Sequence, residues 1–246
     1  MRSTDSPIDS MASIISQTNS PAPNMVHMIA ITPIFDGAAE STALLINALQ
    51  KQTYPNFQNI LISNGPSPII KNLLDKVNDN RFIYNEYPQE DTPTVPQLME
   101  NLGKRRNFCL KNYVADRYFF FDADLKIIDT EFFNKIQVMH KRADVIISKL
   151  EFYGAELPGP KLRRGEIDLG NYSVSRKIAD KYDYPTKYES DNNVAFDWRF
   201  FSLVKNEGVY FSNILYAVKD GNNNYKTVSA KFINWVMGAA NMPNQE

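Results

Sequence analysis

The stretch Tyr118-Phe119-Phe120-Phe121-Asp122-Ala123-Asp124 decides the fold class of this chain. Its consecutive aromatic residues are typical of a central strand that is buried on both faces of a sheet. Two carboxylates follow at once and therefore lie at the carboxyl end of that strand. In open α/β sheets this edge is where ligands bind. The segment predicts a buried strand that delivers acidic side chains to a site.

The residues before this strand alternate between strand and helix patterns. Apolar runs predict three earlier strands, at 26–35, 60–62 and 81–84. Apolar spacings of three and four predict helices between them: one that carries Leu45 and Leu49 and ends before Pro55, one over 69–77 and one over about 97–113. This alternation indicates an α/β domain with a central, mostly parallel sheet that is flanked by helices.

Beyond Asp124 the alternation weakens. The pattern still predicts a helix around 132–139, a strand over 145–150, a helix over 198–204 and one or two late strands in 208–218. The range 151–188 is typical of a loop, with one short apolar-polar segment at 171–175. We therefore expect 25–125 to be a nucleotide-binding half, 126–225 a variable half that shapes the substrate site, and 226–246 a C-terminal helix or tail. Residues 1–24 are rich in Ser, Thr, Pro and Asn and predict a disordered leader.

Composition excludes several classes of protein. The chain has 246 residues, 43% of them hydrophobic, and a net charge of -1, so it can bury a core but has no global field for nucleic acid. The single cysteine, Cys109, excludes an internal disulfide, and two histidines exclude a histidine-rich metal centre. No apolar run approaches the roughly 20 residues of a membrane span. We expect a cytoplasmic protein that can reach a membrane surface through the molecule on which it acts.

Several motifs occur together in one order. They are Gln52-Thr53-Tyr54-Pro55, the strand at 59–62, Ser63-Asn64-Gly65-Pro66, the run from Gly103 to Asn107, and Phe121-Asp122-Ala123-Asp124. In order and spacing, over about 25–220, the chain resembles the family 2 glycosyltransferases of the GT-A fold. One departure is Asn64, which stands where relatives usually have an aspartate; its amide can still hydrogen-bond a base or ribose but carries no charge.

The resemblance implies a nucleotide site at the carboxyl ends of the first strands. The residues carried over to nucleotide binding are Thr32, Pro33, Asp36, Asn64, Glu86, Arg106, Asn107 and Asp122. It also implies that Asp122 and Asp124 bind Mn²⁺ or Mg²⁺, the hard cations that carboxylates suit. Turn chemistry alone also explains Pro33 and Asp36.

Arginine and lysine residues in the third predicted helix need a separate interpretation. Arg106 lies on an apolar stripe with Leu98, Leu102 and Cys109, where an unpaired guanidinium is costly, so it needs a carboxylate or ligand partner. Asp122 is the simplest such partner. Lys104 and Arg105 fit a solvated helix face as well as they fit a binding role.

The resemblance also implies a catalytic base in the second half. Transfer with inversion needs a carboxylate that takes the proton of the acceptor hydroxyl, and Asp197 is our candidate; an N-cap role is compatible, and Asp191 is the fallback. Tyr172, Tyr188 and Trp198 are candidates for stacking on a sugar or for the core. Lys161, Arg163 and Arg164 are candidates for binding a pyrophosphate or for a solvated loop. No histidine follows Asp197, so Asp220, Asn222 or a water molecule would complete the metal ligands.

These observations lead to one main hypothesis and two alternatives. The main hypothesis is an inverting, metal-dependent glycosyltransferase that moves a sugar from a nucleotide-diphosphate donor, a UDP-sugar, to a hydroxyl acceptor in glycan or polysaccharide biosynthesis. The first alternative is a sugar-phosphate nucleotidyltransferase, although only Gly37 lies where that chemistry commonly uses a glycine-rich loop. The second is a non-catalytic module that binds sugar nucleotides.

Overall fold

The computed structural model describes residues 25–92, 94–152, 154–158, 167–187 and 196–219. Several sequence predictions lie outside these residues: the leader at 1–24, the tail at 226–246, and Lys161, Arg163, Arg164, Tyr188, Asp191, Asp220 and Asn222. Within the described part, no helix is both long enough and apolar enough to span a bilayer.

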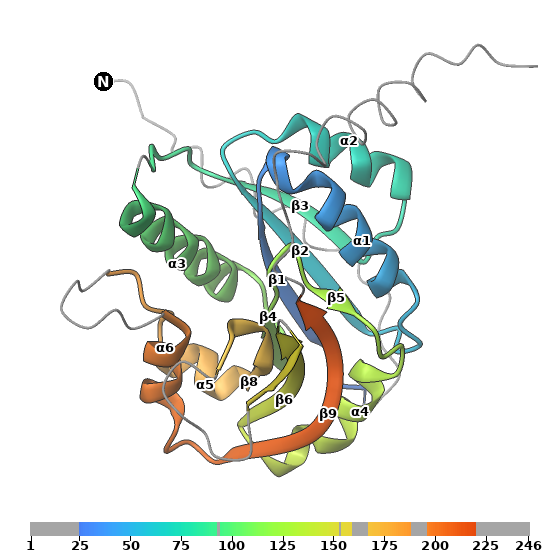
Figure 1. The fold of residues 1–246 in the computed structure, drawn as a ribbon, viewed down its shortest axis with the longest axis vertical. Coiled ribbons are helices and arrows are strands. Elements are labelled where there is room, and N and C mark those ends of the chain that lie inside the picture. Colours follow the sequence, from blue (N-terminus) through green and yellow to red (C-terminus); the bar gives the residue numbers. More distant parts are fainter. Residues whose placement is uncertain (1–24, 93, 153, 159–166, 188–195, 220–246) are drawn as a thin grey trace, which may run out of the picture.

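The first half of the fold is a four-stranded parallel sheet. Its strands are β1 (Met28–Ile34), β2 (Phe57–Asn64), β3 (Phe82–Tyr87) and β4 (Arg117–Phe120), in the spatial order β3-β2-β1-β4. The short 3-10 helix η2 (Asp36–Ala38) leads into α1 (Ala39–Gln50), which lies with α2 (Pro68–Val77) on one face of this sheet, and α3 (Val95–Asn112) covers the other (Figure 1). The four strands predicted in this half are confirmed.

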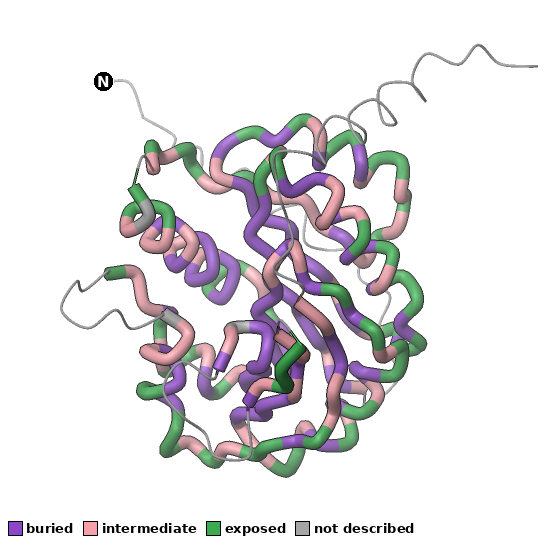
Figure 2. The backbone as a smooth tube through the Cα atoms, in the orientation of Figure 1, coloured by how far each residue is buried: buried purple, intermediate pink, exposed green. Residues whose placement is uncertain are grey.

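Alternation along β1 explains why both faces are covered. Met28 and Ala30 pack in the cluster that contains the buried residues of α1, whereas Ile29 and Ile31 pack in the cluster that contains Cys109 of α3. Successive side chains of a strand point to opposite faces, so an uninterrupted apolar run needs helices on both sides. Figure 2 shows this as a buried centre with partly exposed helices around it.

The second half extends the same sheet with mixed pairing. From β4 the order continues β8 (Tyr172–Ser175), β6 (Val145–Phe152), β9 (Val209–Lys219) and β5 (Lys126–Ile127), while β7 (Ala155–Leu157) pairs with β6. β8 is antiparallel to both of its neighbours, and β9 is parallel to β6 with register shifts near Lys149. The long β9 curls around this end of the sheet (Figure 1).

Helices cover this second part too. They are α4 (Phe132–Met139), η3 (His140–Arg142), η4 (Leu169–Asn171), α5 (Arg176–Lys181) and α6 (Phe196–Val204). The prediction of a loop over 151–188 is therefore wrong, because β7, η4, β8 and α5 lie within that range. β8 has only four residues and alternates Tyr and Val with Ser, so it is too short to give a clear periodic signal.

The buried face of α3 also differs from the prediction. Leu98 is 42% exposed, whereas Asn101, Arg105, Arg106 and Cys109 are buried. Arg105 is therefore not on a solvated face: its Nη1 donates to the carbonyl oxygens of Ile34 (3.1 Å) and Ile62 (3.0 Å), at the carboxyl ends of β1 and β2. The helix thus turns guanidinium and amide groups toward the sheet edge that the sequence marks as a ligand site.

Candidate active site

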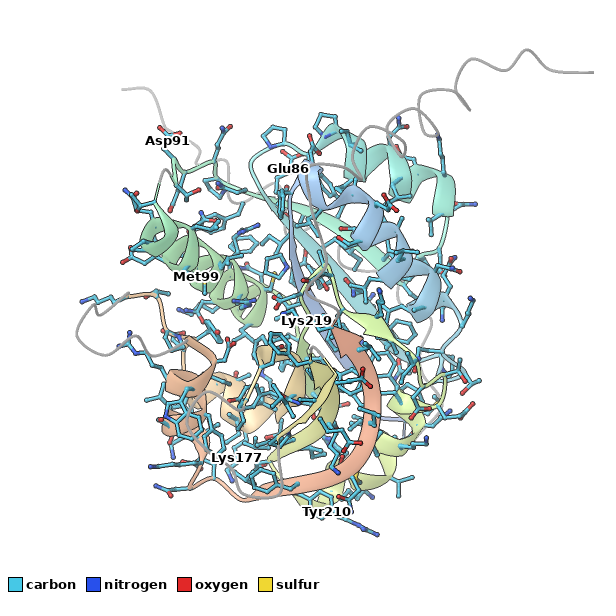
Figure 3. All side chains as sticks on the ribbon, viewed as in Figure 1. Glu86, Asp91, Met99, Lys177, Tyr210 and Lys219 are labelled. Carbon is cyan, nitrogen blue, oxygen red and sulfur yellow. The ribbon has the colours of Figure 1, made fainter. Side chains whose placement is uncertain are left out.

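Four carboxylates and two cationic side chains gather beyond the carboxyl end of β4. They come from distant segments: Asp122 and Asp124 follow β4, Asp168 precedes η4, Asp197 lies in the first turn of α6, Arg106 lies on α3, and Lys219 ends β9. Figure 3 places Lys219 near the middle of the molecule, at the tip of β9, and Glu86 well away from it.

Lys219 is the centre of the acidic group. Its Nζ lies 2.7 Å from Asp122 Oδ2 and 3.2 Å from Asp168 Oδ2, both within hydrogen-bonding distance, and 3.8 Å from Asp124 Oδ1. The Lys219 side chain is 15% exposed and that of Asp168 is 13% exposed. The three carboxylates raise the pKa of Lys219 against the opposing effect of its burial, so the ammonium stays charged.

Arg106 holds the second oxygen of Asp122. Its Nη2 donates to Asp122 Oδ1 at 3.0 Å, and its side chain is only 4% exposed. The predicted need for a carboxylate partner is confirmed, and the partner is Asp122. Although burial works to raise the pKa of Asp122, Lys219 and Arg106 together hold it below its ordinary value. Asp122 is therefore the carboxylate of this group that is most firmly ionised.

Asp197 lies in a different electrostatic setting. Its Oδ1 accepts a hydrogen bond from Tyr184 Oη at 2.9 Å, and its backbone oxygen accepts one from Tyr172 Oη, also at 2.9 Å. Burial, followed by the negative charges of Asp168 and Asp122, raises the pKa of Asp197 to about 7. A carboxylate with such a pKa can both take and hold a proton near neutral pH.

The pKa values of two neighbouring acids are raised as well. Burial is the main cause that raises the pKa of Asp168 and of Asp124, while Lys219 opposes it in both cases. Four carboxylates faced by two fixed cations cannot all ionise at little cost. The geometry thus separates a charged end of the site, around Asp122, from a proton-accepting end at Asp197.

Asn107 and Gly103 join α3 to the segment that carries Tyr184. Both ends of the Asn107 amide bond the Tyr184 backbone: Nδ2 donates to the carbonyl oxygen at 2.8 Å, and Oδ1 accepts from the amide nitrogen at 2.7 Å. A Cβ placed on Gly103 would lie 2.3 Å from the carbonyl oxygen of Pro185. The Arg106 guanidinium also stacks over the Tyr184 ring, 4.9 Å from its centroid. These contacts fix the tyrosine that binds Asp197.

The remaining predicted nucleotide residues line the edge formed by β1, β2 and β3. Thr32 Oγ1 accepts a hydrogen bond from Asn59 Nδ2 at 3.1 Å inside the sheet, and the neighbouring Pro33 is buried. Asp36 Oδ1 accepts from Ser67 Oγ. Glu86 lies exposed on the outer strand β3 and is not brought to the acidic group. Their roles in nucleotide binding stay predictions.

Asn64 is engaged by the segment after β3. Its Nδ2 donates to the carbonyl oxygen of Glu90 at 2.8 Å, and its Oδ1 accepts from the Glu90 amide at 3.0 Å and from Asn101 Nδ2 at 3.2 Å. The Glu90 carboxylate in turn bonds Lys104 Nζ at 2.8 Å. The Asn64 amide therefore fixes the segment around Glu90 beside the predicted site of the nucleobase.

The aromatic candidates separate into core and surface. Tyr172 is buried and packs against the rings of Phe200 and Phe201, which makes it a core residue. Trp198 is half-buried, with its ring 5.4 Å from that of Phe201. Sugar stacking by Trp198 stays a prediction.

The sequence interpretation missed Asp168, Tyr184 and Lys219. Asp168 begins a short turn in which its Oδ1 accepts from the Gly170 amide at 2.9 Å, so the Asp-x-Gly spacing was a usable turn signal. Lys219 is a lone cation after an apolar strand segment. No local pattern relates it to Asp122, 97 residues earlier.

Comparison with solved structures decides the fold. Residues 1–349 of S. aureus TarS in complex with UDP match with a TM-score of 0.58 and 16% identity, over 78% of this chain and 60% of that one. The mannosyltransferase PcManGT from Pyrobaculum calidifontis, in complex with GDP-Man and Mn²⁺, matches with a TM-score of 0.55 and 9% identity, over 94% of this chain and 69% of that one.

The chain has the GT-A fold. Its sheet and flanking helices agree with the fold that the resemblance implied. The chain spans 60% of the TarS fragment and 40% of the longer TarS structure, which matches with a TM-score of 0.59 and 14% identity. No protein-family model and no curated protein matches the sequence. The GT-A assignment thus rests on the arrangement of the elements.

Proposed function

We propose that this chain transfers a sugar from a nucleotide-diphosphate donor, a UDP-sugar, to a hydroxyl acceptor with inversion at the anomeric carbon, in the synthesis of a glycan or polysaccharide. The observation that carries the proposal is Asp197: a carboxylate with a pKa raised to about 7, held by Tyr184, beside the acidic residues that follow β4. Structural neighbours that bind UDP and GDP-Man support a nucleotide-sugar donor.

The proposed reaction is a single displacement. The acceptor oxygen attacks the anomeric carbon while its proton passes to the Asp197 carboxylate, and the bond from that carbon to the diphosphate oxygen breaks. The electron pair of the broken bond leaves on the nucleoside diphosphate. The departing group gains negative charge, which a preorganised cation stabilises strongly in a site that excludes water.

The nucleotide is expected at the edge formed by β1 to β4. Arg105, which lies at the carboxyl ends of β1 and β2, and Arg106, which pairs with Asp122, supply positive charge there. The residues proposed to shape this edge are Thr32 and Pro33 in β1, Asp36 just after it, Asn64, Glu86 and Asn107. The second half, with Asp197, is proposed to face the acceptor.

Mn²⁺ or Mg²⁺ between Asp122 and Asp124 is the cofactor that the sequence predicts. The carboxylates converge as a cation site requires, but the cation that they contact is the Lys219 ammonium, and Arg106 takes the other oxygen of Asp122. Among the described residues, no group of three or more His, Cys, Asp or Glu side chains is arranged to bind a metal ion. The residues as folded do not fit the ion, and the proposed reaction uses only side chains.

A binding panel followed by a turnover assay tests the proposal. Purified protein is titrated by calorimetry with UDP, GDP and several UDP-sugars, and release of UDP from each bound donor is then measured with glycan acceptors. We expect UDP to bind more tightly than GDP, and one UDP-sugar to be turned over. Binding of a UDP-sugar without any turnover favours a non-catalytic binding module, and turnover of a nucleoside triphosphate with a sugar phosphate favours a nucleotidyltransferase.

A further inference from the structure

We infer that the Lys219 ammonium is the resident cation of the acidic group and that it, in place of a divalent metal ion, faces the diphosphate of the donor. The inference rests on the proposed function for its substrate. Its structural content, that Lys219 excludes a metal ion from Asp122 and Asp124, stands independently and can be tested without turnover.

The first argument is the number of oxygens already engaged. Asp122 Oδ2 accepts from Lys219 at 2.7 Å and Asp122 Oδ1 accepts from Arg106 at 3.0 Å, so both oxygens bond side-chain cations. Mg²⁺ requires direct oxygen ligands at about 2.1 Å in near-octahedral geometry. An ion that bound a remaining lone pair of Asp122 would lie beside Lys219 or Arg106 and would bind against their positive charge.

The second argument is charge. An ion that entered between Asp122 and Asp124 would add two positive charges where Lys219 already lies 2.7 Å and 3.8 Å from their oxygens. Repulsion between such neighbours is strong in a partly buried site. The ammonium therefore competes with a divalent ion for the same carboxylates, and it is covalently attached.

The third argument is that the backbone holds Lys219 in place. Lys219 is in register with Phe152 of β6, and the preceding Val218 is in register with Lys126 of β5, so strands lie on both sides of this end of β9. The Nζ lies 5.9 Å from the centre of the Phe152 ring. Because the paired strand end already fixes the backbone of Lys219, placing its ammonium costs only side-chain conformational entropy.

The fourth argument is the donor capacity that remains. An ammonium has three N–H donors, and hydrogen bonds to Asp122 and Asp168 use two of them among the described residues. The Asp122 side chain is 33% exposed, so the group can be reached from solvent. When the bond to the anomeric carbon breaks, the diphosphate oxygen takes the electron pair, and the ammonium offers that oxygen a charged donor without itself being consumed.

Metal binding and UDP binding of the donor-free protein test this inference. The variant is Lys219→Met, which keeps an unbranched side chain of nearly the same length and removes the ammonium group. The matched control is Lys149→Met on β6, whose ammonium pairs with the exposed Glu156 at 3.0 Å, outside the acidic group. Mn²⁺ binding is followed by electron paramagnetic resonance, and UDP binding by calorimetry with excess EDTA or with MnCl₂.

We expect the wild type and the control to bind UDP equally well in EDTA and in MnCl₂ and to bind no stoichiometric Mn²⁺. We expect Lys219→Met to gain a Mn²⁺ site, and its sugar-transfer rate in EDTA to fall by about 10²-fold, with recovery in MnCl₂. A lysine with only a structural role would lower stability without creating a metal site.

Stoichiometric Mn²⁺ binding by the wild type, or loss of its UDP binding in EDTA, would overturn the inference. Should Lys219→Met not fold, Lys219→Arg replaces it: this variant keeps a positive charge and must exclude Mn²⁺ as the wild type does, and Mn²⁺ binding by it contradicts the inference. If the wild type binds no UDP under any condition, the proposed function fails. The Mn²⁺ measurement still tests whether Lys219 excludes a metal ion from Asp122 and Asp124.

Discussion

Three strands of the first half of the sheet come from neighbouring segments of the chain, whereas β4 and the strands of the second half pair across long connections. β1, β2 and β3 follow one another in sequence and lie side by side, all parallel. β4 instead pairs with β8, and β6 with β9, across long connections. The acidic group lies where the two halves meet. The parallel first half positions Arg106, Asp122 and Asp124, and the mixed second half adds Asp168, Asp197 and Lys219.

This difference suggests a division of roles. We propose that the first half presents the nucleotide edge and that the second half supplies the proton acceptor Asp197 together with Asp168 and Lys219. Substitutions in the two halves should then have separable effects on the transfer rate, on the pKa of Asp197 and on the stability of the fold.

Asp197→Asn should abolish most of the sugar transfer while leaving UDP binding intact. Asparagine keeps the size of the side chain but cannot take the acceptor proton, and removal of a general base commonly costs about 10²–10⁴-fold in rate. kcat and the calorimetric UDP affinity are measured on the same preparation. A variant with normal kcat would place the base elsewhere. Loss of UDP binding would contradict the proposed division of nucleotide binding and proton transfer between the two halves.

The pH dependence of kcat should report the environment of Asp197. Because the base must be ionised and its pKa is about 7, kcat should rise with pH and level off above that value. Tyr184 Oη hydrogen-bonds the carboxylate and favours its ionised form, so Tyr184→Phe should move the midpoint to higher pH and lower kcat several-fold at pH 6. An unchanged midpoint in Tyr184→Phe would contradict this assignment.

Gly103→Ala should destabilise the junction between α3 and the segment after α5. The added methyl group would lie 2.3 Å from the carbonyl oxygen of Pro185, which is backbone and cannot move aside cheaply. Overpacking of this kind costs about 2–3 kcal/mol, measured by urea unfolding. The control is Leu98→Ala on the exposed face of the same helix, for which a much smaller change is expected. Equal losses in both variants would argue against the close approach.

The stability of the fold should also depend on pH through Asp197. A carboxyl with a pKa near 7 in the folded protein and an ordinary pKa in the unfolded chain favours folding less as pH rises from about 4 through 7. Asp197→Asn removes this penalty, so its stability should match that of the wild type at pH 4 and exceed it at pH 8. Thermal unfolding at both pH values checks this, and a variant less stable than the wild type at pH 8 would contradict it.

The sequence predicts the first half well because its signals are local. The strand at 118–121, the two aspartates after it and the partner of Arg106 all follow from short-range periodicity and from the cost of an unpaired guanidinium. Arg105 shows the limit of this reasoning. It lies on the buried face of α3 and bonds two strand-end carbonyls, a satisfaction that depends on tertiary structure and leaves no trace in helical spacing.

The second half is harder to predict for a physical reason. β8 is four residues long, and it lies between β4 and β6 through pairings that no nearby residue specifies. Asp168 and Lys219 come together only after β9 has curled around the sheet. Asp197 could be proposed because the resemblance carried an acidic residue to this part of the chain, whereas its proton affinity depends on Asp168, which had no role assigned.

The bonds between Asn107 and Tyr184, with the contact between Gly103 and Pro185, bear on how this protein could be recombined with others. A hybrid protein joined to a foreign sequence near residue 125 would keep α3 but lose the segment 182–187, whose Tyr184 and Pro185 contact this helix. Grafting of a foreign acceptor half should succeed only when residues 182–187 travel with α3. The useful unit of exchange in this chain is therefore discontinuous in sequence.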